Sequence, residues 1–304
     1  MPRLLEDKVI VVTGAGAGVG KGIALEAARQ GAKMVVNDLG VAIDGTGGSS
    51  APAQLTVDEI LAAGGIACAN TESVADWKSA QRIVQQALDL YGRVDAVVNN
   101  AGNLRDAIFH KMSEEDFDAV LAVHLKGSFN MSRAASPHFK SEGSGVFVHM
   151  TSTSGLVGNF GQANYCAAKM GIVGLSKAIA LDMERFNVRS NCIAPFAFTR
   201  MVDTIPTTTP EGAARMAVNR RLEAAKIAPF ACALMTDAAR SVTGQIFGVR
   251  NNEIFLFSQP RPIRTAHAGG GWTVQACLDV ALPMMQPSFY PLERSKDVFS
   301  WDPV

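Results

Sequence analysis

The feature that most constrains the fold of this chain is a glycine-rich turn between a short apolar run and a helix-forming segment. The apolar run covers residues 8–12, the turn 13–20 and the helical segment 21–30. An apolar run of this length is typical of a strand buried on both faces of a parallel sheet. A strand, glycines and a helix in this order bring backbone N–H groups and a positive dipole end together, which suits a pyrophosphate. The sequence therefore predicts a dinucleotide site lined by Gly14, Gly18, Val19 and Gly20.

Strand and helix patterns alternate along most of the chain. Further strands are expected at residues 33–37, 66–70, 94–98, 146–150, 188–193 and, as the last one, 245–249. Helices are expected at 54–63, from Asp76 to Tyr91, after Ser113, and at 162–183, with Asp76 and Ser113 as capping residues. This alternation predicts an α/β fold with a doubly wound parallel sheet, the Rossmann fold.

The second predicted strand closes on Asp38, followed by Leu39. A carboxylate at this strand tip is where an adenosine ribose would be hydrogen-bonded, and its charge would repel a 2′-phosphate. No basic residue stands at Ala17 or directly after Asp38 to offset that charge, so NAD is expected rather than NADP. Ser73 and Val74 follow the third strand and are placed to touch the adenine. The alternative for Asp38 is a solvated loop carboxylate.

Tyr165 and Lys169 stand four residues apart in the helix expected at 162–183, so their side chains share one face. A nearby ammonium favours phenolate and is expected to lower the pKa of the tyrosine, which could then exchange protons with an alcohol or ketone. Ser152 follows the strand at 146–150 and could hold the substrate oxygen. A tyrosine and a lysine on an ordinary amphipathic helix are the alternative, and the upstream serine favours catalysis.

Composition excludes several other classes of protein. Charged residues make up 18% of the chain and its formal net charge is zero, so no nucleic-acid partner is expected. The five cysteines are scattered and lack a CxxC pair, which predicts free thiols and no metal site. No apolar run reaches membrane-spanning length and no targeting signal is recognisable, so a soluble, cytoplasmic protein is expected.

Two helices carry further hypotheses. His124 lies in the apolar helix after Ser113, where a lone histidine is more often a core residue than an acid–base group. The helix at 162–183 has small and apolar residues around nearly its whole circumference, which suggests contact with a partner subunit in a homodimer or homotetramer.

The chain is expected to form one domain, residues 1–257, with a C-terminal extension at 258–304. Three consecutive threonines between prolines lie in a segment, 200–225, that is a plausible substrate lid. The extension is rich in proline but also in aromatic residues, which argues against free disorder. We expect an ordered arm that docks on this or a neighbouring subunit.

Together these residues resemble the short-chain dehydrogenase/reductase family over roughly residues 5–250. The resemblance implies that Tyr165 is the general acid/base, that Ser152 orients the carbonyl, and that Lys169 holds the nicotinamide ribose. It also implies that the cofactor is lined by five further residues, Asn99, Ala101, Gly102, Pro195 and Thr199.

Two positions depart from the family pattern. His124 replaces an asparagine that supports a water in the proton relay, which makes the imidazole a candidate for the same role. Phe196 replaces a glycine after Pro195 and is expected to narrow the space near the nicotinamide.

Segments around Asp38, at 99–106, around His124 and at 158–165 more closely resemble the (3R)-hydroxyacyl-CoA dehydrogenase part of peroxisomal multifunctional enzymes of type 2. The resemblance implies an oxidoreductase that interconverts a secondary alcohol and a ketone. Its expected substrate is a 3-hydroxyacyl-CoA with a fatty or steroid-derived acyl chain. A free hydroxysteroid dehydrogenase and a 3-oxoacyl-carrier-protein reductase are alternatives. A dinucleotide-binding sensor is the non-enzymatic alternative, against which the retained Ser152, Tyr165 and Lys169 argue.

Overall fold

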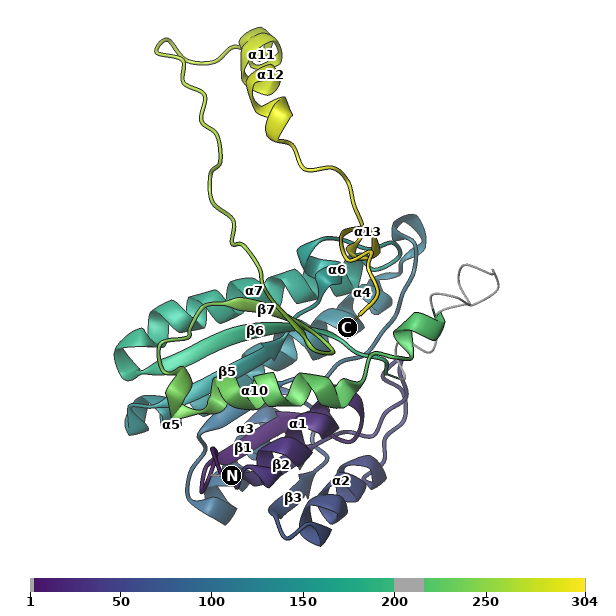
Figure 1. Cartoon of the computed structure of the whole chain (residues 1–304), viewed down its shortest axis with the longest axis vertical. Helices are drawn as coiled ribbons and strands as arrows, with labels where there is room; N and C mark the ends of the chain where they lie inside the picture. The colour runs from purple at the N-terminus through teal and green to yellow at the C-terminus, as the bar shows by residue number, and fades with distance from the viewer. Residues whose placement is uncertain (1–2, 200–215, 304) are drawn as a thin grey trace.

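The computed structural model describes residues 3–199 and 216–303, and its centre is one eight-stranded sheet in the order β3-β2-β1-β4-β5-β6-β7-β8 (Figure 1). All neighbouring strands are parallel except β7 and β8, which form an antiparallel pair. The strand bounds are β1 Val9–Thr13, β2 Lys33–Asn37, β3 Ile66–Asn70, β4 Ala96–Asn99, β5 Gly145–Met150, β6 Val188–Phe196, β7 Ile246–Arg250 and β8 Glu253–Leu256. The predicted doubly wound α/β fold is confirmed.

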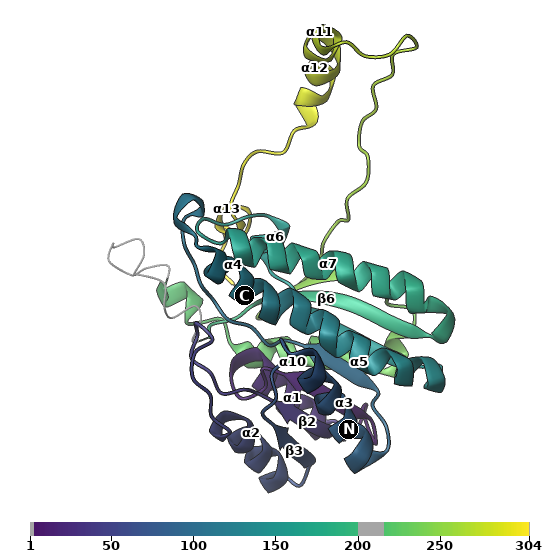
Figure 2. The same cartoon turned by 180° about the vertical axis from the view of Figure 1, so that it is seen from behind.

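Helices cover both faces of the sheet. On one face α1 (Gly18–Arg29) packs against α2 (Ala51–Ala62) and α10 (Ala228–Met235). On the other face, seen in Figure 2, lie α3 (Trp77–Tyr91), α5 (Gly127–Glu142) and α7 (Ala163–Met183). Because the strands point their side chains alternately to the two faces, the sheet separates two apolar cores. In the described part of the chain, no helix is both long and apolar enough to cross a membrane.

Local signals in the sequence set most helix ends. The Asp76 carboxylate accepts a hydrogen bond from the Ser79 N–H at 2.7 Å, and Gly92 ends α3 in the left-handed conformation. The Ser113 hydroxyl accepts from the Asp116 N–H at 3.1 Å and begins α4 (Glu114–Leu121). Both predicted caps are confirmed.

The expectation that the last strand is the one near residue 249 is wrong. Two asparagines, Asn251 in the left-handed conformation and Asn252, turn the chain from β7 into β8, which forms the antiparallel edge. The helices α5 and α10 were also not expected. A shorter helix, α6 (Thr153–Leu156), follows directly after β5.

The C-terminal extension is an arm that leaves the body after β8 and comes back to it (Figures 1 and 2). Its outer part holds α11 (Val274–Ala276) and α12 (Leu282–Met285), and projects away from the sheet. Its first residues stay near the sheet, where Gln259 Nε2 donates to Gly244 O at 2.7 Å, and its returning end, with α13 (Ser295–Val298), packs on the same chain's body. The predicted lid at 200–225 lies outside the described residues over 200–215.

Candidate active site

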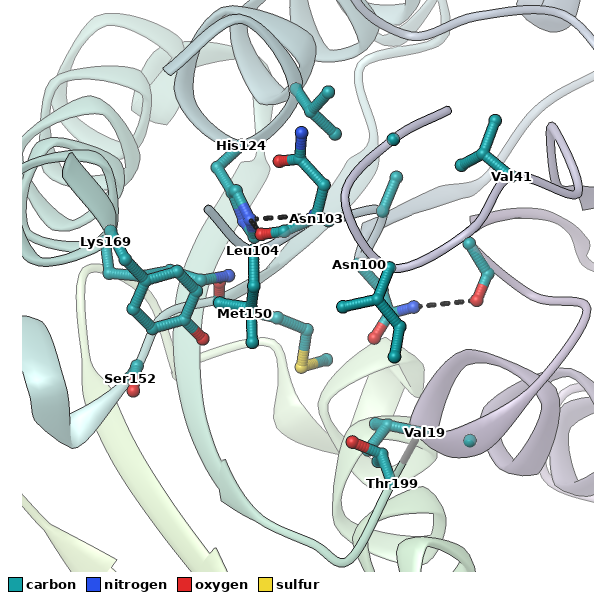
Figure 3. Close-up of a pocket in the computed structure, with 18 of the residues that line it drawn as sticks. Val19, Val41, Asn100, Asn103, Leu104, His124, Met150, Ser152, Lys169 and Thr199 are labelled. Carbon is teal, nitrogen blue, oxygen red and sulfur yellow. Dashed lines mark hydrogen bonds between the residues drawn. The ribbon is translucent and has the colours of Figure 1, made fainter. Parts of the chain in front are cut away.

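A cavity of about 1550 Å³ lies at the carboxyl ends of the parallel strands. Strands of a parallel sheet end at one edge, so the residues that follow β1, β2, β4, β5 and β6 meet there even though they are far apart in sequence. In Figure 3, Ser152 and Lys169 lie on one side of this cavity, and Val19 and Thr199 lie together on another. The volume exceeds that of an ordinary small-ligand pocket and has room for a dinucleotide beside a second molecule.

The glycine turn allows the backbone to approach the cavity closely. Gly14 has φ +63°, and a Cβ there would lie 2.8 Å from Ala101 Cα. A Cβ on Gly20 would lie 2.3 Å from Gly14 O, because α1 begins directly against the turn. Gly18 (φ +56°) lies beside Thr199, whose Cγ2 would be 3.3 Å from such a Cβ. A residue with a Cβ would be strained at each of these positions, which supports the predicted role of the glycines in the turn.

Asp38 is held at the tip of β2 and is only 8% exposed. Its Oδ2 accepts a hydrogen bond from the Gly16 N–H at 2.8 Å, and its Oδ1 accepts from the Gly40 N–H at 2.7 Å. The two bonds fix the carboxylate against the wall of the cavity and leave further acceptor positions on both oxygens. The alternative of a solvated loop carboxylate is therefore wrong.

Asn99, the last residue of β4, and Asn100, which follows it, point to different sides of the strand. Asn100 donates from Nδ2 to Thr13 O at 2.9 Å and to Gly14 O at 3.0 Å, and it lines the cavity. Asn99 points the other way, into the interior, where its Nδ2 lies 3.0 Å from Ser132 Oγ and 3.1 Å from His149 Nδ1. The structure does not bring Asn99 to the cavity, because successive side chains of a strand point to opposite faces. The prediction that Asn99 lines the cofactor is therefore wrong, and Asn100 lines the cavity in its place.

The three candidate catalytic residues converge as expected. Ser152 follows β5 and caps α6, with its Oγ accepting from the Ser154 N–H at 3.1 Å. Tyr165 and Lys169 lie on α7, and the Lys169 Nζ is 5.4 Å from the centroid of the tyrosine ring. All three line the cavity. The arrangement places a phenol, a hydroxyl and an amine around one end of it.

The pKa of Tyr165 differs from the sequence expectation. Burial raises the pKa of Tyr165 to about 12, and the hydrogen bond with Ser152 acts in the opposite direction. The Lys169 Nζ lies over the face of the Tyr165 ring and donates its hydrogen bond to Met150 O on β5 at 2.6 Å. Burial also lowers the pKa of Lys169 to about 7. The expectation that Lys169 lowers the pKa of Tyr165 is not what this geometry gives; Ser152 is the group that lowers it.

His124 is 2% exposed and lies in a π-helical turn, Ala122–Lys126, between α4 and α5. Its Nε2 is 2.8 Å from Asn103 O and 3.1 Å from Asn103 N. Its Nδ1 is buried without a hydrogen-bond partner, and its ring meets the Tyr165 ring edge-on at 5.2 Å between centroids. Burial and then the charge of Lys169 lower the pKa of His124 to about 3, so the imidazole is neutral at pH 7. The structure thus brings His124 to the catalytic residues.

Phe196 does not narrow the cavity as expected. Pro195, Ala197, Phe198 and Thr199 line the cavity, but Phe196 turns away and packs against Phe255 and Phe299, at 6.3 and 4.8 Å between ring centroids. Phe196 lies in β6 with an ordinary negative φ, so no left-handed conformation is required there.

The remaining predicted cofactor residues all line the cavity except Gly20, which lies beneath the turn. Sequence reasoning missed the loop after β2 and the residues after β4 and α6. These residues are Val41, Ala42, Ile43, Asn103, Leu104, Asn159 and Phe160. They carry no motif of their own, and only the position of each loop at the carboxyl edge of the sheet could have pointed to them.

Comparison with known proteins agrees with this geometry. A family model described as short chain dehydrogenase matches residues 8–209. A short-chain type dehydrogenase/reductase of Mycobacterium tuberculosis is 54% identical over 201 residues, 66% of this chain and 70% of that protein. The peroxisomal multifunctional enzyme type 2 of Mus musculus is 46% identical over 204 residues, 67% of this chain. The aligned part is only 27% of that longer enzyme.

Two further similarities extend into the C-terminal arm. The hydroxyacyl-CoA dehydrogenase ChsB1 of Mycobacterium tuberculosis is 38% identical over 286 residues, 88% of this chain and 84% of that protein. The crystal structure of a short chain dehydrogenase from Mycobacterium avium superposes with a TM-score of 0.81 and 36% identity. That superposition covers 95% of this chain and 97% of the other.

Proposed function

The chain belongs to the short-chain dehydrogenase family and is an oxidoreductase acting on CH–OH groups, and from this premise we propose that it uses NAD to interconvert a 3-hydroxyacyl-CoA and its 3-ketone. The observation that carries the proposal is the convergence of Ser152, Tyr165 and Lys169 at one end of a cavity whose other end holds Asp38 and the glycine turn.

The described residues fit a dinucleotide. Gly14, Gly18 and Val19 line the cavity at the start of α1, so backbone N–H groups there can meet a pyrophosphate. The Asp38 carboxylate can accept from a ribose, and Ser73 and Val74 line the cavity where the adenine would lie. When bound, the nicotinamide supplies or accepts the hydride at C4.

The residues of the chain do the remaining work. Ser152 holds the substrate oxygen by a hydrogen bond next to the Tyr165 hydroxyl. Tyr165 gives its proton to that oxygen during reduction and takes it back during oxidation. Lys169 holds the nicotinamide ribose, while the hydrogen bond from Ser152 favours the ionised form of the Tyr165 phenol.

Apolar side chains support an acyl substrate. Leu104, Met150 and Phe198 line the cavity near the catalytic residues, and Phe160 lines it while remaining largely exposed. Ile108 and Phe109 are also exposed after β4. Such a surface suits a hydrocarbon chain or ring system more than a sugar or an amino acid. The name of the ChsB1 relative agrees with an acyl-CoA substrate.

Turnover on a substrate panel tests the proposal. The purified chain is assayed with NAD and NADP against 3-hydroxyacyl-CoAs of increasing chain length, a steroid-derived acyl-CoA, free hydroxysteroids, and a 3-oxoacyl carrier protein with each reduced cofactor. We expect the highest kcat/KM with NAD and an acyl-CoA. A higher kcat/KM on a free steroid or on the carrier-protein substrate would contradict the acyl-CoA assignment. Dinucleotide binding without turnover on any substrate would favour a sensor.

Asp38→Ala should reduce the preference for NAD. We expect the wild-type chain to bind NAD at least about tenfold more tightly than NADP, roughly 1.4 kcal/mol, because the fixed carboxylate accepts from the ribose and repels a 2′-phosphate. The variant should lose most of that ratio and keep turnover. Dissociation constants for both cofactors are the measurement, with Asp58→Ala on the exposed side of α2 as the control. Equal affinities in the wild-type chain would place Asp38 away from the ribose.

We infer that His124 supports the proton relay as a neutral hydrogen-bonding group. If Nε2–H donates to Asn103 O, the shorter of its two contacts, then Nδ1 is an acceptor without a partner in the protein. A water on Nδ1 could then pass a proton between Lys169 and solvent. The alternative is a packing histidine held by Asn103 alone.

His124→Ala separates the two roles. A relay predicts a clear fall in kcat with unchanged melting temperature and NAD affinity, whereas His124→Asn should keep most activity because asparagine can hold the same water. If the alanine variant loses activity only in proportion to lost thermal stability, His124 is a packing residue.

We infer a homodimer or homotetramer, because α7 leaves Met170 and Leu181 exposed while carrying few charges. A cytoplasmic location stays a prediction from the sequence. Sedimentation of the purified chain measures the number of subunits.

A further inference from the structure

The last part of the chain returns to the body next to the active site and contacts the segment that carries Ser152. Ser295 at the start of α13 donates from its N–H to Gly158 O at 2.9 Å, and its hydroxyl lies 2.6 Å from Thr153 Oγ1. Arg294 lies over the Phe160 ring at 5.2 Å. Thr153 follows Ser152 directly, and Phe160 lines the cavity, so these contacts hold both ends of the 153–160 segment.

A second group of contacts ties the tail to the end of β6. Phe299 packs on Phe196, next to Pro195, which lines the cavity. Trp301 packs beside Phe299 at 5.7 Å between centroids and donates from Nε1 to Glu253 Oε1 at 2.6 Å. These contacts hold the Phe196 side chain, which replaces the glycine of the family pattern, against the returning tail.

Arg250 at the end of β7 contacts the aromatic rings of Phe196 and Trp301. It is only 5% exposed, its guanidinium donates to Trp301 O, and it lies 5.8 Å from the Phe196 ring and 5.3 Å from the Trp301 ring. A buried guanidinium needs such partners, because an unpaired buried charge is costly. The tail is therefore attached to the sheet through the buried Arg250 guanidinium.

The tail ends on a third element. Asp302 Oδ2 lies 3.2 Å from Nη1 of Arg221, which stands between residue 216 and β7. Residues 295–303 thus join three parts of the body that surround the catalytic end of the cavity: the 153–160 segment, the end of β6 and the region of Arg221. None of these tail residues lines the cavity itself, so any effect on catalysis must pass through the residues they hold.

We propose that residues 295–303 form a C-terminal clasp that positions the Ser152 segment and the end of β6 for turnover of the substrate. Ser295 and Trp301 are its main positioning residues. The glycine turn and Asp38 lie at the other end of the cavity from the catalytic residues, so we expect dinucleotide binding not to depend on the clasp. Small displacements of catalytic groups have large kinetic effects, which is why distant contacts can matter.

Ser295→Ala and Trp301→Ala test the clasp. We expect each to lower kcat/KM for the substrate by about tenfold or more, with the NAD dissociation constant and melting temperature unchanged. Trp301→Phe keeps a ring for Phe299 and Phe255 and should restore most of the lost kcat/KM. Leu292→Ala, in the fully exposed part of the returning arm, is the matched control and should behave as the wild type.

Hydrogen exchange provides a readout that does not need the substrate. The kinetic test rests on the proposed function, but the exchange test stands without it. In the NAD-bound chain, amides of the 153–160 segment should exchange faster in Ser295→Ala than in the wild type, while amides of α1 should not change. Unchanged exchange and unchanged kcat/KM in both variants would overturn the proposal. A loss of NAD affinity and stability in parallel with activity would also overturn it, since the tail would then only stabilise the fold.

Discussion

Tyr165→Phe is expected to abolish nearly all turnover while leaving NAD binding unchanged. The substitution removes only the phenolic hydroxyl, which is the one group placed to exchange a proton with the substrate oxygen. General acid–base groups contribute about 10²- to 10⁴-fold to rate, so a loss of at least about 100-fold is expected. Steady-state kinetics on the best substrate of the panel and a dissociation constant for NAD are the measurements.

Tyr290→Phe is the control for this variant. It removes the same phenolic hydroxyl from a residue that is 86% exposed in the arm. Retention of more than a tenth of the wild-type rate by Tyr165→Phe would show that another group carries the proton.

The pKa of about 12 also predicts a pH dependence for the wild-type chain. A raised pKa means that the phenol is protonated near neutral pH and that the phenolate fraction grows as pH rises towards the pKa. Oxidation of the alcohol uses the phenolate as base, so its kcat/KM should rise with pH above 7. Reduction of the ketone uses the phenol as acid and should not rise with it.

Lys169→Met is expected to damage both turnover and dinucleotide binding, unlike Tyr165→Phe. Lys169 is 4% exposed, and burial of its charge already costs free energy, so an unbranched apolar side chain of similar length should be accommodated by the fold. The variant loses the donor for the nicotinamide ribose and the amine at which the proposed proton relay begins. We expect kcat to fall by about 100-fold or more and NAD affinity to fall with it.

Lys177→Met is the matched control, because Lys177 lies on the same helix as Lys169. We expect its kcat and NAD affinity to equal those of the wild type. The measurements are kcat, the NAD dissociation constant and the melting temperature of each variant. If Lys169→Met lowered the melting temperature steeply and the residual folded enzyme were fully active, Lys169 would have a structural role instead.

Much of the fold and of the site follows from local signals that the sequence carries in order. The apolar run before Gly14 predicts β1, and the glycines predict the tight start of α1. The apolar run that ends before Asp38 predicts β2 with Asp38 at its tip. The four-residue spacing of Tyr165 and Lys169 predicts their common face on α7. These features depend on residues near each other in the chain, and for that reason the sequence alone determines them.

Other features depend on contacts between distant segments, and only the tertiary structure decided them. Whether Asn99 or Asn100 faces the cavity depends on how β4 is oriented in the sheet. The direction of the Lys169 ammonium depends on Met150, and burial by many segments together raises the pKa of Tyr165. The Phe196 ring turns towards Phe299, more than a hundred residues further along the chain, because the arm comes back to that point. No local pattern encodes such a pairing; it arises where packing brings two distant apolar surfaces together.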